Sequence, residues 1–277
     1  MTALIEARSI CYRVRDRFLV AEASLRAEPG ELLVVVGPNG AGKTTLLKLL
    51  TGELKSSAGH ISLDGENIHD IPPWALAARR AVMTQAARLT FPFSVAEVVR
   101  LGVDGVGRRL AAARRHEIIA AAIRSADVEA LSGRLYQTLS GGEQQRVQFA
   151  RALAQLAAGS SIAERRVLFL DEPVASLDLN HQLGLMQAAT RECAKGVCVI
   201  AVLHDLNLAA TFADRLVVMR GGRIVADGTP GQVLSTELVR DVFAVDLPLN
   251  ELPGENLPFI LPQHYARKAP AASAASF

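Results

Sequence analysis

Long apolar runs and paired cysteines are both missing from this chain of 277 residues. Its strongly apolar runs, such as residues 32–36 and 198–203, have the length of buried strands and fall far short of the ~20 residues that a membrane-spanning helix needs. The three cysteines include no Cys-x-x-Cys pair, which argues against a disulfide framework or a zinc site and fits a reducing compartment. Since no apolar segment near residue 1 indicates a secretory signal, we expect any membrane association to come through a partner.

An excess of one charge is missing as well. The chain has 30 basic and 28 acidic side chains, a formal net charge of +2 and a pI of about 8.5. The basic residues are scattered, and pairs such as Arg79-Arg80 and Arg114-Arg115 are most simply solvated faces. A balance this close creates no field that would attract nucleic acid, so we expect no nucleic-acid partner.

Strand-like and helix-like segments alternate along most of the chain. Residues 4–14 and 18–27 mix apolar and polar side chains, which is typical of antiparallel strands, and the wholly apolar run at 32–36 fits a strand covered on both faces. From about residue 95 to 156 the pattern is helical. The alternation predicts an α/β fold with a mostly parallel sheet. Further strands are expected at 61–63, 81–83, 167–170, 198–202 and 216–218, and helices at 43–50, 109–125, 182–192 and 206–213.

A glycine-rich loop follows the apolar run at 32–36. Its glycines would let backbone N–H groups converge on phosphates, and the helix N-terminus that follows adds positive potential. Lys43 would reach the β- and γ-phosphates of ATP, and Thr44 would place its hydroxyl on Mg²⁺. An ordinary glycine-rich turn is the alternative, which the strand–loop–helix setting disfavours. The loop and its continuation comprise Gly37, Pro38, Asn39, Gly40, Ala41, Gly42, Lys43, Thr44 and Thr45, of which the first eight fit the P-loop pattern.

Two carboxylates, Asp171 and Glu172, follow the apolar segment at 167–170. In P-loop ATPases the first of such a pair holds Mg²⁺, and the second orients or deprotonates the water that attacks the γ-phosphate. Two adjacent acids after a strand would by themselves fit a solvated turn equally well. The P-loop upstream favours the functional interpretation, so we expect Asp171 to be a metal ligand and Glu172 to be the catalytic base.

The segment from Leu139 to Arg146, with the letters LSGGEQQR, indicates a second anion site. Ser140 supplies a hydroxyl, and Gly141 and Gly142 expose backbone N–H groups at the start of a helix. A plain helix N-cap is the alternative. Because one nucleotide does not need two separate phosphate cradles in one chain, we predict that this cradle binds the nucleotide of a second subunit.

Taken together, these motifs resemble the ABC ATPase family over about residues 4–242. The resemblance implies an α/β fold, namely a P-loop NTPase core with a mostly parallel sheet, an antiparallel β subdomain and an inserted α-helical subdomain. ATP and Mg²⁺ are the implied cofactors. The expected organisation is one ABC ATPase domain at 1–242 with its helical subdomain at about 86–157, a C-terminal extension at 243–267 and a disordered tail at 268–277.

Four further residues match landmarks of this family. Tyr12 resembles the aromatic residue that stacks on adenine, although alone it would fit an ordinary strand residue. Gln85 resembles the Q-loop glutamine, which touches Mg²⁺ and the catalytic water, and Asp178 lies in a segment similar to the D-loop that crosses the dimer interface. His204 resembles the switch histidine that contacts the γ-phosphate, although a lone histidine there is usually structural. The implied catalytic residues are Glu172, His204 and Gln85, and the implied metal ligands are Thr44, Gln85 and Asp171.

Longer stretches narrow the branch of the family. Residues 203–210 resemble importers of iron chelates, haem and cobalamin, and residues 90–99 and 133–140 are similar to bacterial haemin-import ATP-binding proteins. This resemblance implies a homodimer with two transmembrane permease subunits and a periplasmic substrate-binding protein, placed on the cytoplasmic face of the inner membrane. An importer of ferric siderophore or cobalamin, an exporter subunit and a non-transport ABC ATPase are the alternatives. The last class usually has two cassettes or a coiled coil with a Cys-x-x-Cys hook, and this chain has neither.

The residues after Gln85 form a candidate contact with a permease. Leu89, Phe91 and Phe93 are apolar side chains around Pro92, beside a loop that the resemblance ties to the nucleotide. We expect them to be exposed and to line a groove that accepts a short permease helix. The alternative is that the two phenylalanines pack inside the helical subdomain.

Overall fold

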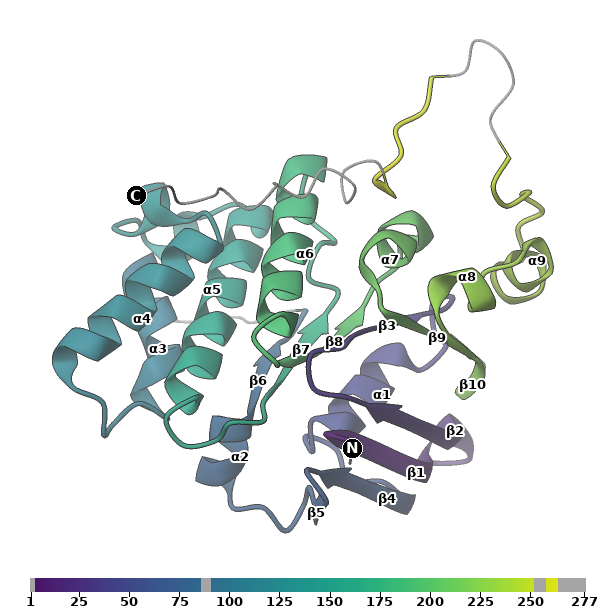
Figure 1. Ribbon diagram of the computed structural model, residues 1–277, viewed down its shortest axis with the longest axis horizontal. Coiled ribbons are helices and arrows are strands. Elements are labelled where there is room, and N and C mark those ends of the chain that lie inside the picture. Colours follow the sequence, from purple (N-terminus) through teal and green to yellow (C-terminus); the bar gives the residue numbers. More distant parts are fainter. Residues whose placement is uncertain (1–2, 86–90, 252–257, 264–277) are drawn as a thin grey trace, which may run out of the picture.

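The computed structural model describes residues 3–85, 91–251 and 258–263 of the chain. Its strands form two sheets, both visible in Figure 1. The four-stranded sheet is antiparallel, with the strand order β2-β1-β4-β5, as the mixed pattern near residue 1 predicted. Residues 86–90 and the tail predicted at 268–277 lie outside the described residues. The strands of this sheet are β1 (Ile5–Val14), β2 (Arg17–Ala27), β4 (Ala58–Leu63) and β5 (Glu66–Asn67).

The six-stranded sheet is mostly parallel, which confirms the predicted α/β class. Its strand order is β10-β9-β3-β8-β7-β6, and only β10 is antiparallel to its neighbour. Every residue of β3, β7 and β8 is buried, because this sheet is covered on both faces. The strands are β3 (Leu32–Val36), β6 (Arg80–Met83), β7 (Val167–Asp171), β8 (Cys198–Val202), β9 (Arg215–Arg220) and β10 (Arg223–Gly228).

The six-stranded sheet separates two hydrophobic cores. Successive side chains of a strand point to opposite faces, so Leu32, Val34 and Val36 pack into one core while Leu33 and Val35 pack into the other. The second core is shared with the antiparallel sheet and with the leucines of α1. In Figure 1 the longer helices α3 to α6 lie together on the opposite side from that sheet. This double burial explains why β3 has no polar position.

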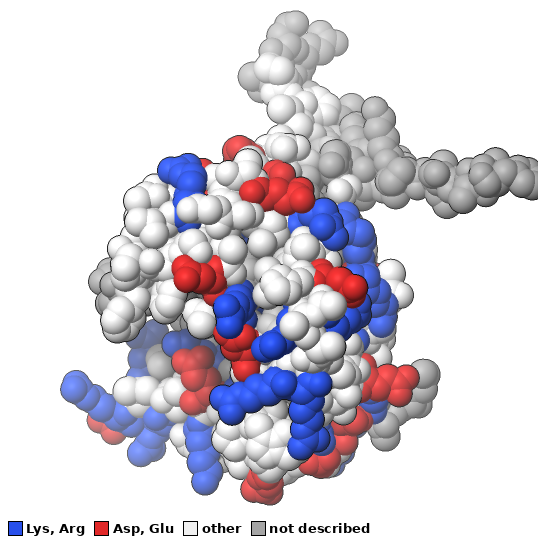
Figure 2. Space-filling model, turned by 90° about the vertical axis from the view of Figure 1, so that its left-hand side faces the viewer, with Lys and Arg blue, Asp and Glu red and all other residues white. Residues whose placement is uncertain are grey.

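The helices are α1 (Lys43–Leu50), α2 (Pro73–Arg79), α3 (Val95–Asp104), α4 (Ala112–Ser125), α5 (Gly141–Gly159), α6 (Leu179–Cys193), α7 (Leu206–Phe212), α8 (Pro230–Val233) and α9 (Thr236–Phe243). Two short 3-10 turns, η1 (Glu129–Leu131) and η2 (Tyr136–Thr138), separate α4 from α5. Within the described ranges, none of these helices has both the length and the apolar character needed to cross a bilayer. On the face shown in Figure 2, basic and acidic side chains are interspersed.

The helical stretch predicted at 95–156 is interrupted twice. The helix predicted at 109–125 begins only at Ala112, because the backbone N–H of Leu110 bonds the Gly107 carbonyl in a turn. At its other end α4 stops where Asp127 takes a left-handed conformation, with φ of 52°, and the Val128 N–H bonds back to the carbonyl of Ile123. The end of α4 at Ser125 is therefore the one predicted, whereas its start lies three residues later than predicted.

Helices α3 and α5 pack closely against each other at Gly102, and this contact is testable. A Cβ atom on Gly102 would lie 2.2 Å from the backbone oxygen of Arg151, so Gly102→Ala must push the helices apart. We expect it to lower the free energy of unfolding by about 1–3 kcal/mol, measured by urea denaturation. Gly105→Ala is the matched control, since nothing lies within 4 Å of its Cβ position and its φ of −72° suits alanine. Equal stability of the two variants would contradict the close packing.

Candidate functional site

The glycine-rich loop connects β3 to α1 and is shaped by its own backbone. Gly37 and Gly42 have φ of 152° and 99°, and a Cβ atom there would lie 2.2 Å from the Met219 oxygen and 2.3 Å from the Leu19 oxygen. Only glycine combines these conformations with such close backbone contacts. Helix α1 begins directly at Lys43 without a side-chain cap, so no side chain occupies its N-terminal N–H groups.

Lys43 carries a charge in a place that water hardly reaches. The residue is 5% exposed, and its Nζ donates to the carbonyl oxygens of Gly37 at 2.8 Å and Pro38 at 3.0 Å. Burial lowers the pKa of Lys43, while the nearby carboxylates of Glu172 and Asp171 act in the opposite direction. A buried ammonium whose hydrogen-bond acceptors are neutral carbonyls is suited to an anion, so the loop fits phosphate groups.

Asp171 and Thr44 form the neighbouring part of the site. Asp171, the last residue of β7, is 3% exposed, and the hydroxyl of Thr44 donates to its Oδ1 at 3.2 Å. Burial raises the pKa of Asp171, the hydrogen bond from Thr44 lowers it, and the charge of Glu172 raises it further. A hydroxyl and a buried carboxylate side by side are oxygen donors of the kind that Mg²⁺ prefers, so these residues fit the predicted metal.

Three predicted catalytic residues meet beside this pair. Gln85 donates from Nε2 to Oε2 of Glu172 at 2.6 Å, and Nε2 of His204 lies 2.6 Å from Oε1 of the same carboxylate. The three residues follow β6, β7 and β8, which are parallel neighbours and end at the same edge of the sheet. Each carboxylate oxygen of Glu172 is therefore held by a different side chain. Glu172 itself has φ of 50°, an uncommon conformation for a residue with a side chain.

Ser140, Gly141 and Gly142 lie at the start of α5, where two roles coexist. Ser140 is the N-cap, because its Oγ accepts from the Glu143 N–H at 3.3 Å while its own N–H donates to the Glu143 carboxylate. Both Ser140 and Gly141 are exposed. A Cβ on Gly142 would lie 2.8 Å from the Ser176 oxygen, so this glycine is also needed for packing within the chain. The anion-binding role stays a prediction.

The positions of Asp178 and Tyr12 do not test the roles predicted for these residues. Asp178 is exposed and caps α6, where its Oδ1 accepts from the N–H of His181 at 2.9 Å. That backbone hydrogen bond lowers the pKa of Asp178 more than any other contact does. Tyr12 lies on β1 of the antiparallel sheet, half-buried and packed against the second core. Its packing fits an ordinary strand residue as well as an adenine contact.

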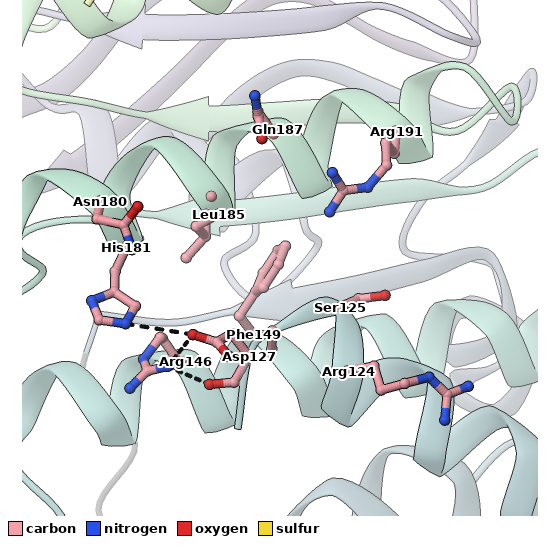
Figure 3. A pocket seen from close by; sticks show the side chains of 12 residues that line it. Arg124, Ser125, Asp127, Arg146, Phe149, Asn180, His181, Leu185, Gln187 and Arg191 are labelled. Atoms are coloured by element: carbon pink, nitrogen blue, oxygen red, sulfur yellow. Dashed lines mark hydrogen bonds and ion pairs between the residues drawn. The ribbon is translucent and has the colours of Figure 1, made fainter. Parts of the chain in front are cut away.

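One residue to which the sequence assigned no role of its own also joins this region. Gln145, four residues after Gly141 on α5, has its side-chain amide bonded to the segment after β7. A cleft of about 220 Å³ lies elsewhere, between α4, α5 and α6, and Figure 3 shows Arg146, Asp127 and His181 at one end of it. None of the predicted site residues lines that cleft. The only local signal for Gln145 was an amide on the buried face of a helix, which is also typical of a structural contact.

Comparison with known proteins identifies a family whose matched segment includes Lys43, Asp171 and Glu172. The model of the ABC transporter family matches residues 20–175 of the chain. The chain belongs to the ABC transporter family. An ABC cassette binds nucleotide, and in this ABC transporter chain the loop from Gly37 to Thr44 is the segment that fits its phosphates.

The similar curated proteins extend over nearly the whole cassette. The hemin import ATP-binding protein HmuV of Rhizobium meliloti strain 1021 is 46% identical over 260 residues, which cover 94% of this chain and 98% of that protein. Its counterpart in Rhodopseudomonas palustris strain CGA009 is 47% identical over 264 residues, covering 95% and 96%. Among solved structures, an ATP-binding subunit of an ABC transporter superimposes with a TM-score of 0.72 at 23% identity, covering 88% of this chain and 94% of that one. That structure shows the shared fold.

The buried carboxylate of Asp171 should lower the stability of the folded chain in the absence of a metal ion, although the same charge favours metal binding. Its folded-state pKa is raised, so its ionised form destabilises the folded chain above that pKa, and the penalty fades as the pH falls through it. Without Mg²⁺ and ATP, Asp171→Asn should therefore melt a few degrees higher than wild type at about pH 8, with a smaller gain at a pH below the raised pKa. Mg-ATP should then raise the melting temperature of wild type more than that of the variant. A variant that melts lower at both pH values would contradict the assigned electrostatic cost.

Proposed function

We propose that the chain is the ATP-hydrolysing subunit of a bacterial ABC importer for haemin. The observation that carries the hydrolytic part is the convergence of Lys43, Asp171, Glu172 and His204 at one edge of the sheet. The transported substrate rests on similarity, because proteins named for hemin import are 42–47% identical over more than nine tenths of this chain.

The P-loop supplies the binding part of the reaction. Lys43 would exchange its two carbonyl contacts for the β- and γ-phosphate oxygens of ATP, because a charged partner satisfies a buried ammonium better than neutral carbonyls do. Thr44 and Asp171 would hold Mg²⁺, with Gln85 completing the predicted set. When bound, Mg²⁺ supplies positive charge that offsets the charge of the phosphate oxygens.

Glu172 is the residue proposed to act on water. Its carboxylate would accept a proton as the water attacks the γ-phosphorus in line. The amide of Gln85 and the ring of His204 each hold one oxygen of this carboxylate at 2.6 Å, which fixes its direction. His204 would contact the γ-phosphate when nucleotide is bound, which is the role that its resemblance to the switch histidine implies.

The second cradle, at the start of α5, supports a second copy of this chain as a partner. We propose that Ser140, Gly142 and Asp178 contact the nucleotide held by a second copy, which makes a head-to-tail homodimer. Exposure of Ser140, Gly141 and Asp178 supports this arrangement. Two transmembrane permease subunits would tie the dimer to the cytoplasmic face of the inner membrane, with a periplasmic binding protein delivering the substrate.

Glu172→Gln tests the hydrolytic role. The amide keeps the shape of the side chain and removes its charge, so the ATPase rate should fall roughly 10²–10⁴-fold while ATP still binds. Because hydrolysis no longer separates the subunits, the variant should accumulate as a dimer in Mg-ATP, which light scattering can measure. A rate within a few-fold of wild type would rule out Glu172 as the base. An unchanged mass with ATP would count against the shared site.

Wild type and Glu172→Gln can also be compared in cells to distinguish the candidate substrates. In a strain lacking its own copy of this gene, wild type should restore growth on haemin as the sole iron source, and Glu172→Gln should not. Restoration on a ferric siderophore, or of cobalamin uptake, with no response to haemin would replace haemin by that substrate and leave the ATPase assignment unchanged.

Phe91 and Phe93 differ in exposure, and only Phe91 fits the docking hypothesis. Phe91 is 68% exposed, as predicted, whereas Phe93 is half-buried and packs against the core of α3 to α5, as the alternative stated. Their ring centroids lie 6.2 Å apart, so an exposed aromatic side chain sits on a packed one. Leu89 lies outside the described residues. We propose Phe91 as the permease contact.

Phe91→Ala should therefore leave the melting temperature and ATP affinity of the chain nearly unchanged and weaken co-purification with the permease. Phe93→Ala is the matched control and should lower the melting temperature, because it removes a packed ring. A Phe91→Ala chain that melts early, or that transports at the full rate, would end the docking assignment.

A further inference from the structure

The loop from Glu172 to Asp178, which connects β7 to α6, is hydrogen-bonded to α5 through the buried side chain of Gln145. Gln145 on α5 is 9% exposed. Its Nε2 donates to the backbone oxygen of Glu172 at 3.0 Å, and its Oε1 accepts from the backbone N–H of Ser176 at 3.1 Å. Both ends of the amide are engaged, so Gln145 spans the first half of the loop and sets its distance from α5.

The two groups joined by Gln145 belong to different functions. At one end, Glu172 has a left-handed backbone, and the direction of its carboxylate depends on that conformation. At the other end, Ser176 lies directly against Gly142, where even a Cβ atom would come within 2.8 Å of the Ser176 oxygen. A shift of the first turn of α5 therefore has to move the loop that carries Glu172.

The next residue of α5 ties the far end of the same loop. Figure 3 shows Arg146 donating to the backbone oxygen and the carboxylate of Asp127, and Asp127 facing the ring of His181. Nε2 of His181 lies 3.6 Å from the Asp127 carboxylate, and its Nδ1 lies 2.8 Å from Oδ1 of Asp178. The loop is thus linked to the start of α5 near both Ser176 and Asp178.

We propose that Gln145 is a positioning residue that couples the two nucleotide sites of the dimer. The proposal rests on the function proposed above, in which the start of α5 binds the partner's nucleotide and Glu172 serves the chain's own. Occupation of the partner's site would fix Ser140 and Gly142, and Gln145 would pass that restraint to the Glu172 backbone. Hydrolysis at one site then depends on occupancy of the other, which is a coupling between two distinct sites.

Gln182 offers a matched control on the opposite side of the loop. Its Nε2 donates to the backbone oxygens of Val174 at 3.4 Å and Leu177 at 3.0 Å, so it stiffens the same loop from α6 without involving α5. Gln145→Met and Gln182→Met both keep the length of the side chain and remove its hydrogen bonds. Only the first removes hydrogen bonds that run directly between the loop and α5.

The experiment measures steady-state ATPase rate against ATP concentration on the full-length chains, together with ATP affinity at dilutions where the chain is monomeric. Wild type should show positive cooperativity. Gln145→Met should lower the maximal rate roughly 5–150-fold, which is the fold-change that typical coupling free energies correspond to. It should also lower the Hill coefficient to about 1. Its monomeric ATP affinity should equal that of wild type, because Gln145 is not expected to touch nucleotide. Gln182→Met should keep its cooperativity even if its rate falls.

The proposal would be overturned if Gln145→Met had wild-type kinetics, or if it were slow but still cooperative. It would also be overturned if Gln182→Met lost cooperativity to the same extent, or if the wild-type chain hydrolysed ATP without cooperativity. Should Gln145→Met melt early, Gln145→Asn replaces it, because it keeps both polar atoms but is too short to make both bonds. A wild-type chain that neither hydrolyses ATP nor dimerises with it would instead contradict the proposed function, which makes the two failures distinguishable.

Discussion

The candidate site depends on the parallel pairing of β6, β7 and β8. Met83 pairs with Leu170 and Asp171 with Val202, so the three strands end at nearly the same level. The residues just beyond those ends, Gln85, Glu172 and His204, can then reach one another. A slip of one residue in this register would turn side chains to the other face of the sheet, and both hydrophobic cores oppose such a slip because every position of β7 and β8 is buried. The packing of the apolar strands thus holds the polar site in register.

A second constraint is electrostatic. Lys43 and Asp171 are 5% and 3% exposed, and burial shifts the pKa of each towards its neutral form. The two charges are opposite, so the ammonium of Lys43 is stabilised by an anion and the carboxylate of Asp171 by a cation. A metal-bound phosphate answers both at once, which gives a physical reason why nucleotide and Mg²⁺ would bind here together. The folded chain carries this cost in advance, as binding sites commonly do.

Helix α5 serves packing and function with the same residues. Ser140 and Glu143 form a capping box that the helix needs for its own N-terminus, and Gly142 lets the loop after β7 pass close by. These are the positions proposed to reach a partner's nucleotide. A helix start that is stabilised within the chain presents its exposed N–H groups in a fixed direction, so the structural role and the proposed binding role support each other.

The sequence alone determined what depends on neighbours in the chain. The P-loop, the Asp171-Glu172 pair and the cap at Ser140 are patterns of residue type at short spacing, and the apolar strands follow from burial on both faces. The fold class and the family were predictable for that reason. Tertiary structure decided what depends on distant segments: the contacts of Glu172 with Gln85 and His204, and the exposure of Phe91 beside a packed Phe93.

The role of Gln145 could not be predicted at all from its surroundings in the sequence, because its two partners lie 27 and 31 residues further along the chain. The start of α4 at Ala112, three residues later than predicted, depends on a single turn hydrogen bond at Leu110 that the apolar pattern does not report. Periodicity reports which face of a segment is buried. It does not report which backbone group that face will meet, and this choice is made only when the sheet and helices have assembled.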